Sequence, residues 1–198
     1  MFVTFEGLDG SGKTTQVELL RASLEASGRE VVTTREPGGT ELGEAVRRLV
    51  LHGPAMTPWA EAALFAAARA ELVAEVIRPA LERGAVVVSD RYFDSSLAYQ
   101  GAARELGIDA VLELNLSVVG GLVPDLTFLL LLSPAEARRR AGDHPDRIER
   151  EWDAFRAAAD AGYREVALRF PRRVVALDGA LPVDELAEIV RARLGVAV

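Results

Sequence analysis

The 198-residue chain has no cysteine, two histidines and a single lysine, and each shortage excludes a class of protein or site. Without cysteine there is no disulfide and no thiolate metal site. The two histidines, His52 and His144, are too few for a histidine-rich metal site. No apolar run approaches the roughly 18 residues that a membrane span needs. The sequence starts directly with a strand pattern, so we expect no signal peptide and a cytoplasmic location.

The charge balance limits the partners further. The net charge is −7, which argues against non-specific binding to long nucleic acid. If the ligand is an anion, positive potential has to be local, so we expect arginines to cluster around it. Lys13 is the only lysine, because every other member of the 23 Lys+Arg is an arginine. The wide guanidinium does not fit a cradle built for an ammonium group, so Lys13 marks a place where an ammonium is needed.

A glycine-rich stretch lies between a strand pattern at residues 2–5 and a helical pattern. It reads Gly7-Leu8-Asp9-Gly10-Ser11-Gly12-Lys13-Thr14, followed by Thr15. This context favours a phosphate-binding loop over an ordinary turn, because glycines and a helix N-terminus can point N–H groups at an anion. Lys13, which we expect to be exposed in the loop, would bring its charge to the outer phosphates, and the Thr14 hydroxyl can ligate Mg²⁺. Residues 7–15 are therefore predicted to bind a nucleotide.

Strand and helix patterns alternate along the rest of the chain. Strands are expected at residues 2–5, 30–34, 85–89, 126–132 and 173–177, and helices at residues 15–27, 41–51, 58–83, 93–102, 109–119, 134–141, 148–170 and 183–194. Pro79 predicts a kink or an early end of its helix. The alternation implies an α/β fold with a parallel sheet covered on both faces and ligands beyond the carboxyl ends of the strands. No linker is visible, so residues 1–198 are expected to form one domain.

Two charged residues follow the apolar strand pattern at residues 85–89. Asp90 suits a Walker-B carboxylate that helps to hold Mg²⁺, although an aspartate can also cap the next helix. Arg91 would point into the same crevice and bridge donor and acceptor phosphates, unless it is a surface arginine. One turn apart on the long helix, Phe65 and Arg69 share a face that suits a nucleobase, but a core phenylalanine beside a surface arginine is the simpler interpretation.

A basic segment flanks the helix break at residues 142–146. Its arginines are Arg138, Arg139, Arg140 and Arg147. A breakable basic segment between two helices suits a lid that closes over a nucleotide, so we predict a lid at about residues 138–150. The alternative is a solvated helix face, because Glu149 and Glu151 can pair with some of these charges.

Several motifs together resemble those of thymidylate kinases, in order and in approximate spacing, from residue 2 to about residue 170. They are Phe5-Glu6-Gly7-Leu8-Asp9-Gly10-Ser11-Gly12-Lys13-Thr14-Thr15, Thr34-Arg35-Glu36-Pro37-Gly38-Gly39-Thr40, Asp90-Arg91-Tyr92, Ser95-Ser96-Leu97-Ala98-Tyr99-Gln100-Gly101, Pro124-Asp125-Leu126-Thr127 and Asp146-Arg147-Ile148-Glu149. Many families share the phosphate loop, whereas the second and fourth motifs are far more specific. The resemblance implies a P-loop nucleoside monophosphate kinase fold with five parallel strands and a short lid. It also implies Mg²⁺-dependent phosphoryl transfer from ATP to dTMP in dTTP synthesis, and a homodimer.

The same resemblance assigns roles to particular residues. It implies that Arg47, Arg69 and Arg91 contact the phosphate or base of dTMP, that Phe65 stacks on thymine, and that Ser96, Tyr99 and Gln100 line the pocket for base and sugar. Asp9 would lie near the deoxyribose and the acceptor phosphate, although it can also be only a turn residue. The Glu36–Pro37 peptide bond is expected to be cis or otherwise constrained.

Thymidylate kinases carry their catalytic arginine either in the phosphate loop or in the lid. The variable loop positions 8–11 hold no arginine and the lid is rich in arginine, so the chain resembles the bacterial type. Arg139, Arg140 or Arg147 could then reach the transferred phosphoryl group, and we expect Arg140 and Arg147. The predicted catalytic set is Asp9, Lys13, Arg91, Arg140 and Arg147.

Two other functions stay open at this point. One is another small kinase that acts on deoxynucleosides or on other pyrimidine nucleotides. The other is a nucleotide-dependent switch. Guanine-specific switches use an Asn-Lys-x-Asp motif, and this chain has no lysine outside the phosphate loop, which argues against the switch.

Overall fold

The computed structural model describes residues 1–141, 147–148 and 153–196. Its strands are β1 (Phe2–Glu6), β2 (Val31–Arg35), β3 (Val86–Asp90), β4 (Leu126–Leu131) and β5 (Val174–Asp178). Its helices are α1 (Lys13–Ala26), α2 (Glu41–His52), α3 (Pro58–Leu72), α4 (Arg78–Glu82), α5 (Phe93–Ser96), α6 (Ile108–Val118), α7 (Pro134–Ala141), α8 (Asp153–Arg169) and α9 (Val183–Leu194), with π-helical segments η1 (Val73–Ile77) and η2 (Leu97–Ala103). The predicted alternation of strands and helices is therefore confirmed.

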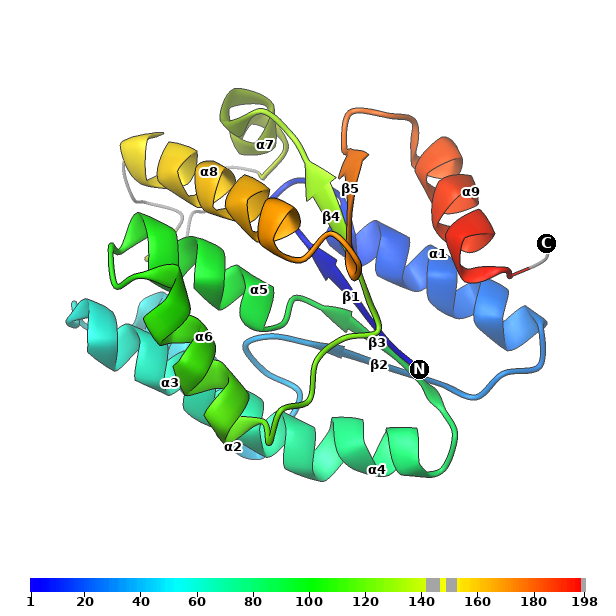
Figure 1. Cartoon of the computed structure of the whole chain (residues 1–198), viewed down its shortest axis with the longest axis horizontal. Helices are drawn as coiled ribbons and strands as arrows, with labels where there is room; N and C mark the ends of the chain where they lie inside the picture. The colour runs from blue at the N-terminus through cyan, green and yellow to red at the C-terminus, as the bar shows by residue number, and fades with distance from the viewer. Residues whose placement is uncertain (142–146, 149–152, 197–198) are drawn as a thin grey trace.

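All described strands belong to one five-stranded parallel sheet with the order β2-β3-β1-β4-β5. Phe5 of β1 and Arg35 of β2 both pair with Asp90 of β3, so the carboxyl ends of these three strands lie next to one another. In Figure 1, α1 and α9 cover one side of the sheet, and α5, α6 and α8 cover the other. The predicted α/β sheet with helices on both faces is confirmed.

Alternate residues of the strands pack in two separate apolar clusters, one on each face of the sheet. Val3 and Phe5 of β1 pack in one cluster with Leu20 of α1 and Val190 of α9. Phe2 of β1 packs in the other cluster, together with residues of α6 and α8 such as Val111 and Val166. Successive side chains of a strand point to opposite faces, which is why β1 is buried along its whole length in the middle of the sheet.

The long helix expected at residues 58–83 is continuous but changes its hydrogen-bonding pattern before Pro79. Residues Val73–Ile77 form η1, where the Arg78 N–H bonds to the Val73 carbonyl five residues earlier. Pro79 follows as the second residue of α4, so the change of pattern lies directly before the residue that has no N–H to donate. The predicted disturbance is therefore present, but it is a π-helical turn before the proline.

Two other predicted helices differ from the structure in their details. The helix expected at residues 93–102 is a single turn of α5 followed by η2, the segment that carries Tyr99 and Gln100. The helix expected from Ile148 begins at Asp153 among the described residues, and Ile148 itself lies in a turn. The predicted lid break at residues 142–146 lies outside the described residues. None of the described helices combines the length and the apolar composition needed to cross a membrane.

Close packing of α8 on η2 holds the segment that lines the site. A Cβ atom on Gly162 would lie 2.7 Å from the Ala102 Cβ and 3.0 Å from the Ala98 Cα. Only a residue without a side chain lets the two backbones approach so closely.

We expect Gly162→Leu to lower the free energy of unfolding by about 1–3 kcal/mol or more, because the side chain would have to push α8 away from η2. Chemical denaturation monitored by circular dichroism measures this loss.

The matched control is Ala157→Leu on the exposed side of the same helix. That substitution should change stability by less than about 0.5 kcal/mol. Equal effects of the two substitutions would contradict the close approach at Gly162.

Candidate active site

The loop between β1 and α1 leaves the sheet at its carboxyl edge. Gly7 has φ +137°, and a Cβ there would lie 2.5 Å from the Leu130 carbonyl oxygen of β4. Gly12 has φ +93° and precedes α1 without any side-chain cap, whereas Thr40 and Thr57 cap α2 and α3. The first N–H groups of α1 are therefore left available to an anion, as the glycine pattern predicts.

Lys13 is buried, which corrects the expectation that it is exposed. Its side chain is 6% exposed, and its Nζ donates to the carbonyl oxygens of Gly7 (3.1 Å) and Leu8 (3.0 Å). Burial and the nearby Arg91 guanidinium lower the pKa of Lys13 to about 8, although Asp9 opposes the shift. The loop thus surrounds the ammonium group, with the carbonyl oxygens of Gly7 and Leu8 turned toward it.

Thr14 and Asp90 meet, as their predicted roles require. The Thr14 hydroxyl donates to the Asp90 Oδ2 at 2.6 Å across the gap between α1 and the end of β3. A hydroxyl and a carboxylate this close fit Mg²⁺, which takes one or two protein oxygens and keeps waters or phosphate oxygens for its other positions. The described residues contain no group of three His, Cys, Asp or Glu that could hold a metal without such help.

Two cavities adjoin each other beyond the carboxyl ends of β1, β2 and β3. The larger, of about 380 Å³, is lined by Asp9, Gly10, Gly12, Lys13, Thr14, Thr15, Arg35, Glu36, Arg47, Asp90 and Arg91. The smaller, of about 100 Å³, is lined by Asp9, Glu36, Pro37, Arg47, Leu51, Phe65, Arg91, Ser95, Ser96, Tyr99, Gln100 and Ile148. The first contains the phosphate loop and the second contains most of the predicted dTMP residues. We call them the loop cavity and the acceptor cavity.

Arg91 lines both cavities and therefore lies where they meet. Its φ of +75° is unusual for a residue with a side chain, and the Ser89 hydroxyl donates to its carbonyl oxygen at 2.7 Å. Its guanidinium donates to Asp9 Oδ1 (2.5 Å), the Gly7 carbonyl (2.9 Å), and the hydroxyls of Ser95 (3.0 Å) and Tyr163 (2.8 Å). Arg91 is thus held between the phosphate loop, α5 and α8.

Asp9 is the ion-pair partner of Arg91 and borders both cavities. Burial alone would raise the pKa of Asp9, but the charges of Arg91 and Lys13 lower it to about 2. Asp9 is therefore an anion throughout the neutral range, with 41% of its side chain exposed.

Arg47 and Phe65 come from different helices and line the acceptor cavity together. Arg47 of α2 donates to the Pro37 carbonyl at 2.9 Å and also borders the loop cavity. Phe65 of α3 packs against the small apolar cluster formed with α2. The Glu36–Pro37 peptide bond between the two cavities is cis, as expected.

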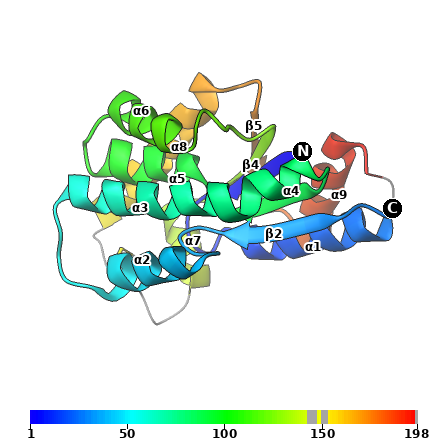
Figure 2. The same ribbon diagram turned by 90° about the horizontal axis from the view of Figure 1, so that it is seen from below.

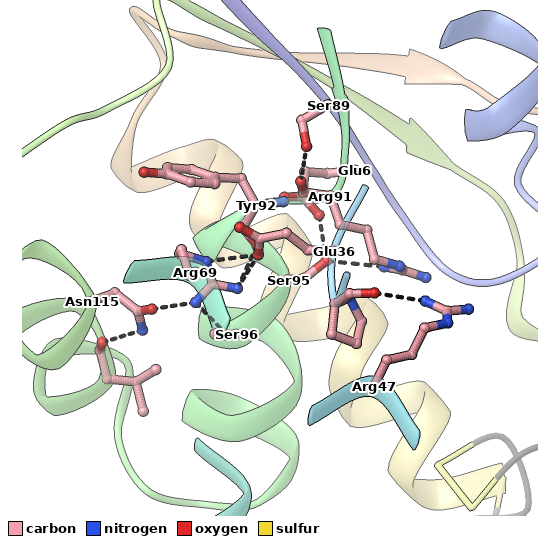
Figure 3. A network of polar contacts seen from close by, with 12 residues as sticks. Glu6, Glu36, Arg47, Arg69, Ser89, Arg91, Tyr92, Ser95, Ser96 and Asn115 are labelled. Carbon is pink, nitrogen blue, oxygen red and sulfur yellow. Dashed lines mark hydrogen bonds and ion pairs between the residues drawn. The ribbon is translucent and has the colours of Figure 1, made fainter. Parts of the chain in front are cut away.

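Arg69 does not line either cavity. It is 1% exposed, and its five N–H groups donate to Glu36, Ser96, Asn115 and the Tyr92 carbonyl (Figure 3). Glu36 and Ser96 do line the acceptor cavity, so Arg69 lies behind its wall. Burial raises the pKa of Glu36, although the Arg69 charge opposes this.

The predicted base and sugar residues come together on α5 and η2. Ser96, Tyr99 and Gln100 all line the acceptor cavity. The Arg91 guanidinium lies 5.6 Å from the centre of the Tyr99 ring. Gln100 donates from Nε2 to Glu61 of α3 at 2.9 Å.

The predicted lid arginines lie in two groups. Arg138 and Arg139 are exposed and pair with Asp153 and Glu136 respectively. Arg140 also bonds to Glu136 and donates to the Gly179 carbonyl after β5 at 3.1 Å.

Arg147 lies apart from the arginines of α7. It donates to Glu61 at 2.6 Å and to the Val50 carbonyl at 2.7 Å, next to the acceptor cavity. The described structure therefore places Arg140 near the β5–α9 connection and Arg147 beside α2 and α3.

The sequence prediction assigns no role to three polar residues of the site, which are Glu6, Glu61 and Tyr163. Glu6 is fully buried, accepts from the Tyr92 N–H (2.7 Å) and the Ser95 hydroxyl (2.5 Å), and receives a longer bond from Tyr163. Burial and the Asp94 charge raise the pKa of Glu6 to about 7. Glu61 is 1% exposed and pairs with Arg104 and Arg147. The position of Glu6 directly before Gly7 is a weak signal in the sequence, whereas the partners of Glu61 and Tyr163 depend on long-range packing.

Comparison with known proteins shows the family of the chain. The family model described as thymidylate kinase matches residues 5–190. A thymidylate kinase of Bifidobacterium longum (strain NCC 2705) is 50% identical over 189 residues, covering 93% of this chain and 92% of that protein. A thymidylate kinase of Leifsonia xyli subsp. xyli is 50% identical over 198 residues, covering 98% and 94%. A thymidylate kinase of Deinococcus radiodurans is 49% identical over 194 residues, covering 96% and 94%. With a phosphate loop that opens onto a second cavity, and with matches over nearly its whole length, the chain belongs to the thymidylate kinase family.

Proposed function

We propose that the chain transfers the γ-phosphoryl group of ATP to dTMP, giving ADP and dTDP for dTTP synthesis. The observation that supports this best is the junction of the two cavities. They share Asp9, Glu36, Arg47 and Arg91, so a phosphate in the loop cavity and a phosphate in the acceptor cavity would meet beside two guanidinium groups. The family match over residues 5–190 gives the nucleotide identities.

In this proposal, residues 7–15 bind the phosphates of ATP. The N–H groups at the start of α1 face the triphosphate, and Lys13 neutralises its outer phosphates. Thr14 and Asp90 would hold Mg²⁺, which would supply positive charge to neutralise the phosphate oxygens.

The acceptor cavity would bind dTMP with its phosphate toward the junction. Phe65 supports the thymine ring, and Ser96, Tyr99 and Gln100 surround base and sugar. Arg47 and Arg91 bind the acceptor phosphate, and Arg69 supports the wall through Glu36. Asp9 orients Arg91 and lies near the sugar.

Little covalent chemistry then falls to the protein. An oxygen of the dTMP phosphate attacks the γ-phosphorus while the bond to the bridging oxygen of ADP breaks. The attacking group is already an anion, so no strong general base is needed and catalysis consists of alignment and charge neutralisation. We assign part of that neutralisation to Arg91, and part to Arg140 and Arg147 of the lid at about residues 138–150.

Two wider features belong to the same proposal. A homodimer is supported by exposed apolar side chains on neighbouring helices, namely Leu42 and Leu49 of α2 and Trp59 of α3. Figure 2 shows α2 beside α3 at one side of the molecule. A cytoplasmic location is supported by the use of ATP as donor, and the whole chain is proposed to act as one kinase domain.

The first prediction concerns the acceptor. ADP release from ATP and Mg²⁺ should be fast with dTMP and much slower with dUMP, dCMP, CMP, dGMP and thymidine. A coupled spectrophotometric assay measures this panel. Turnover with thymidine but not with dTMP would overturn the proposed acceptor while leaving the phosphate loop in place.

The second prediction concerns Lys13. Lys13→Met keeps the length of the buried side chain but removes its charge, so turnover should fall by about 10²-fold or more. In the unaltered protein, kcat/KM for ATP should decrease above pH 8, because deprotonation of Lys13 then removes the charge that receives the phosphates.

Thermal unfolding of Lys13→Met should still be cooperative, since the methionine fills the same space. Turnover near that of the parent protein, or a flat pH profile up to pH 9.5, would contradict the role given to Lys13.

The third prediction separates Arg147 from substrate capture. If it neutralises the transferred group, Arg147→Ala should lower kcat by about 10²-fold while the Kd for dTMP changes much less. Steady-state kinetics and calorimetric titration with dTMP measure the two effects. Arg138→Ala, at an exposed arginine paired with Asp153, is the matched control and should change neither. Weaker dTMP binding with unchanged kcat would place Arg147 in substrate capture instead.

A further inference from the structure

A buried carboxylate on α3 collects hydrogen bonds from three separate parts of the chain. Glu61 is 1% exposed. It accepts from Gln100 Nε2 of η2 at 2.9 Å, from two nitrogens of Arg104 at 3.2 Å, and from Arg147 Nη2 at 2.6 Å. Phe65, one turn further along α3, lines the acceptor cavity, and so does Gln100.

Glu61 is ionised when these partners surround it. Burial alone would raise its pKa, but hydrogen bonds from Arg104, Gln100 and Arg147 lower the pKa below its ordinary value. An ionised carboxylate has no hydrogen to donate and can only accept. Gln100 must therefore turn its NH₂ group, and not its carbonyl, toward Glu61, which fixes the orientation of the amide on chemical grounds.

The other end of the same amide then borders the acceptor cavity. Gln100 Oε1 accepts no hydrogen bond from the described residues, and it is not among their buried side-chain atoms that lack a partner. Gln100 itself lines the acceptor cavity, and Oε1 is the amide atom that is not engaged with Glu61. A carbonyl oxygen in this position can accept a hydrogen bond from an N–H or O–H group of the ligand.

We propose that Glu61 is a positioning residue for base selection, because it holds the Gln100 amide with its carbonyl oxygen toward the ring N–H of the acceptor base. The inference rests on the proposed function. Thymine and uracil carry a hydrogen on the ring nitrogen between their two carbonyl groups, whereas cytosine carries a lone pair on that nitrogen. A fixed carbonyl oxygen attracts the first kind of base and repels the second. Glu61 thus acts on the base through Gln100 without touching it.

The test compares dTMP with dCMP in Glu61→Gln. An amide at position 61 can donate as well as accept, so Gln100 is free to turn and present its NH₂ group to the base. We expect the ratio of kcat/KM for dTMP over dCMP to fall by about tenfold or more, which corresponds to one well-placed hydrogen bond. The loss of the Arg147 partner affects both substrates alike and cancels in the ratio.

A double-mutant cycle shows whether Glu61 acts through Gln100. In a Gln100→Leu background there is no amide to orient, so Glu61→Gln should no longer change the ratio. The matched control is Glu75→Gln, an exposed glutamate further along the same helical region, which should leave the ratio unchanged. A merely structural role of Glu61 would lower both kcat/KM values and leave their ratio as it is.

Two results would overturn the inference. One is a ratio within twofold of the parent in Glu61→Gln, and the other is an equal fall of the ratio in the Gln100→Leu background. If Glu61→Gln does not fold, Glu61→Gln combined with Arg104→Gln removes the opposite charge as well and is held to the same criteria. Assays of the parent protein separate the two proposals. A parent that does not phosphorylate dTMP refutes the proposed function. A parent that prefers dTMP, with a ratio that Glu61→Gln does not change, refutes only this inference.

Discussion

The ion pair between Asp9 and Arg91 joins the parts of the site that the chain supplies from far apart. Its two side chains come from the phosphate loop and from the residue after β3, and Arg91 also bonds to α5 and α8. An arginine can make these contacts together because its guanidinium offers five N–H groups in a fixed plane. The left-handed backbone at Arg91 fits this reasoning, since such a conformation persists only where the surroundings enforce it.

The same arrangement recurs at the other arginines around the acceptor cavity. Arg69 is paired with Glu36, and Arg104 and Arg147 are paired with Glu61, with both carboxylates nearly fully buried. Removing two charges from water is costly, and a buried pair returns that cost only if its remaining hydrogen bonds are made. The expected benefit is therefore geometric, because each carboxylate fixes the direction of the groups that line the cavity.

Much of this site follows from the sequence, and the remainder depends on packing. The loop at residues 7–15 and the meeting of Thr14 with Asp90 are local consequences of strand, turn and helix, with a parallel sheet bringing strand ends together. The exposure of Lys13 could not be predicted in this way, because its burial depends on the carbonyl oxygens that the folded loop turns inward. The spacing of Phe65 and Arg69 places them on one helix face but does not show that Arg69 is buried and bonded to residues of α5 and α6. The partners of Glu61 lie 39 to 86 residues away, beyond any local pattern.

The pairing of cations with carboxylates also explains the charge distribution around the loop cavity. A chain with net charge −7 gains a local site for anions by gathering Lys13, Arg35, Arg47 and Arg91 around the loop cavity, as its sequence predicts. These cations need anions nearby in the absence of substrate, and Asp9, Glu36 and Asp90 line the same cavity. When phosphates enter, the cations are already in place and need little reorganisation, which is where electrostatic stabilisation of phosphoryl transfer is most effective. The carboxylates that hold the cations before binding are for this reason part of the site itself, and their substitution should alter turnover as well as stability.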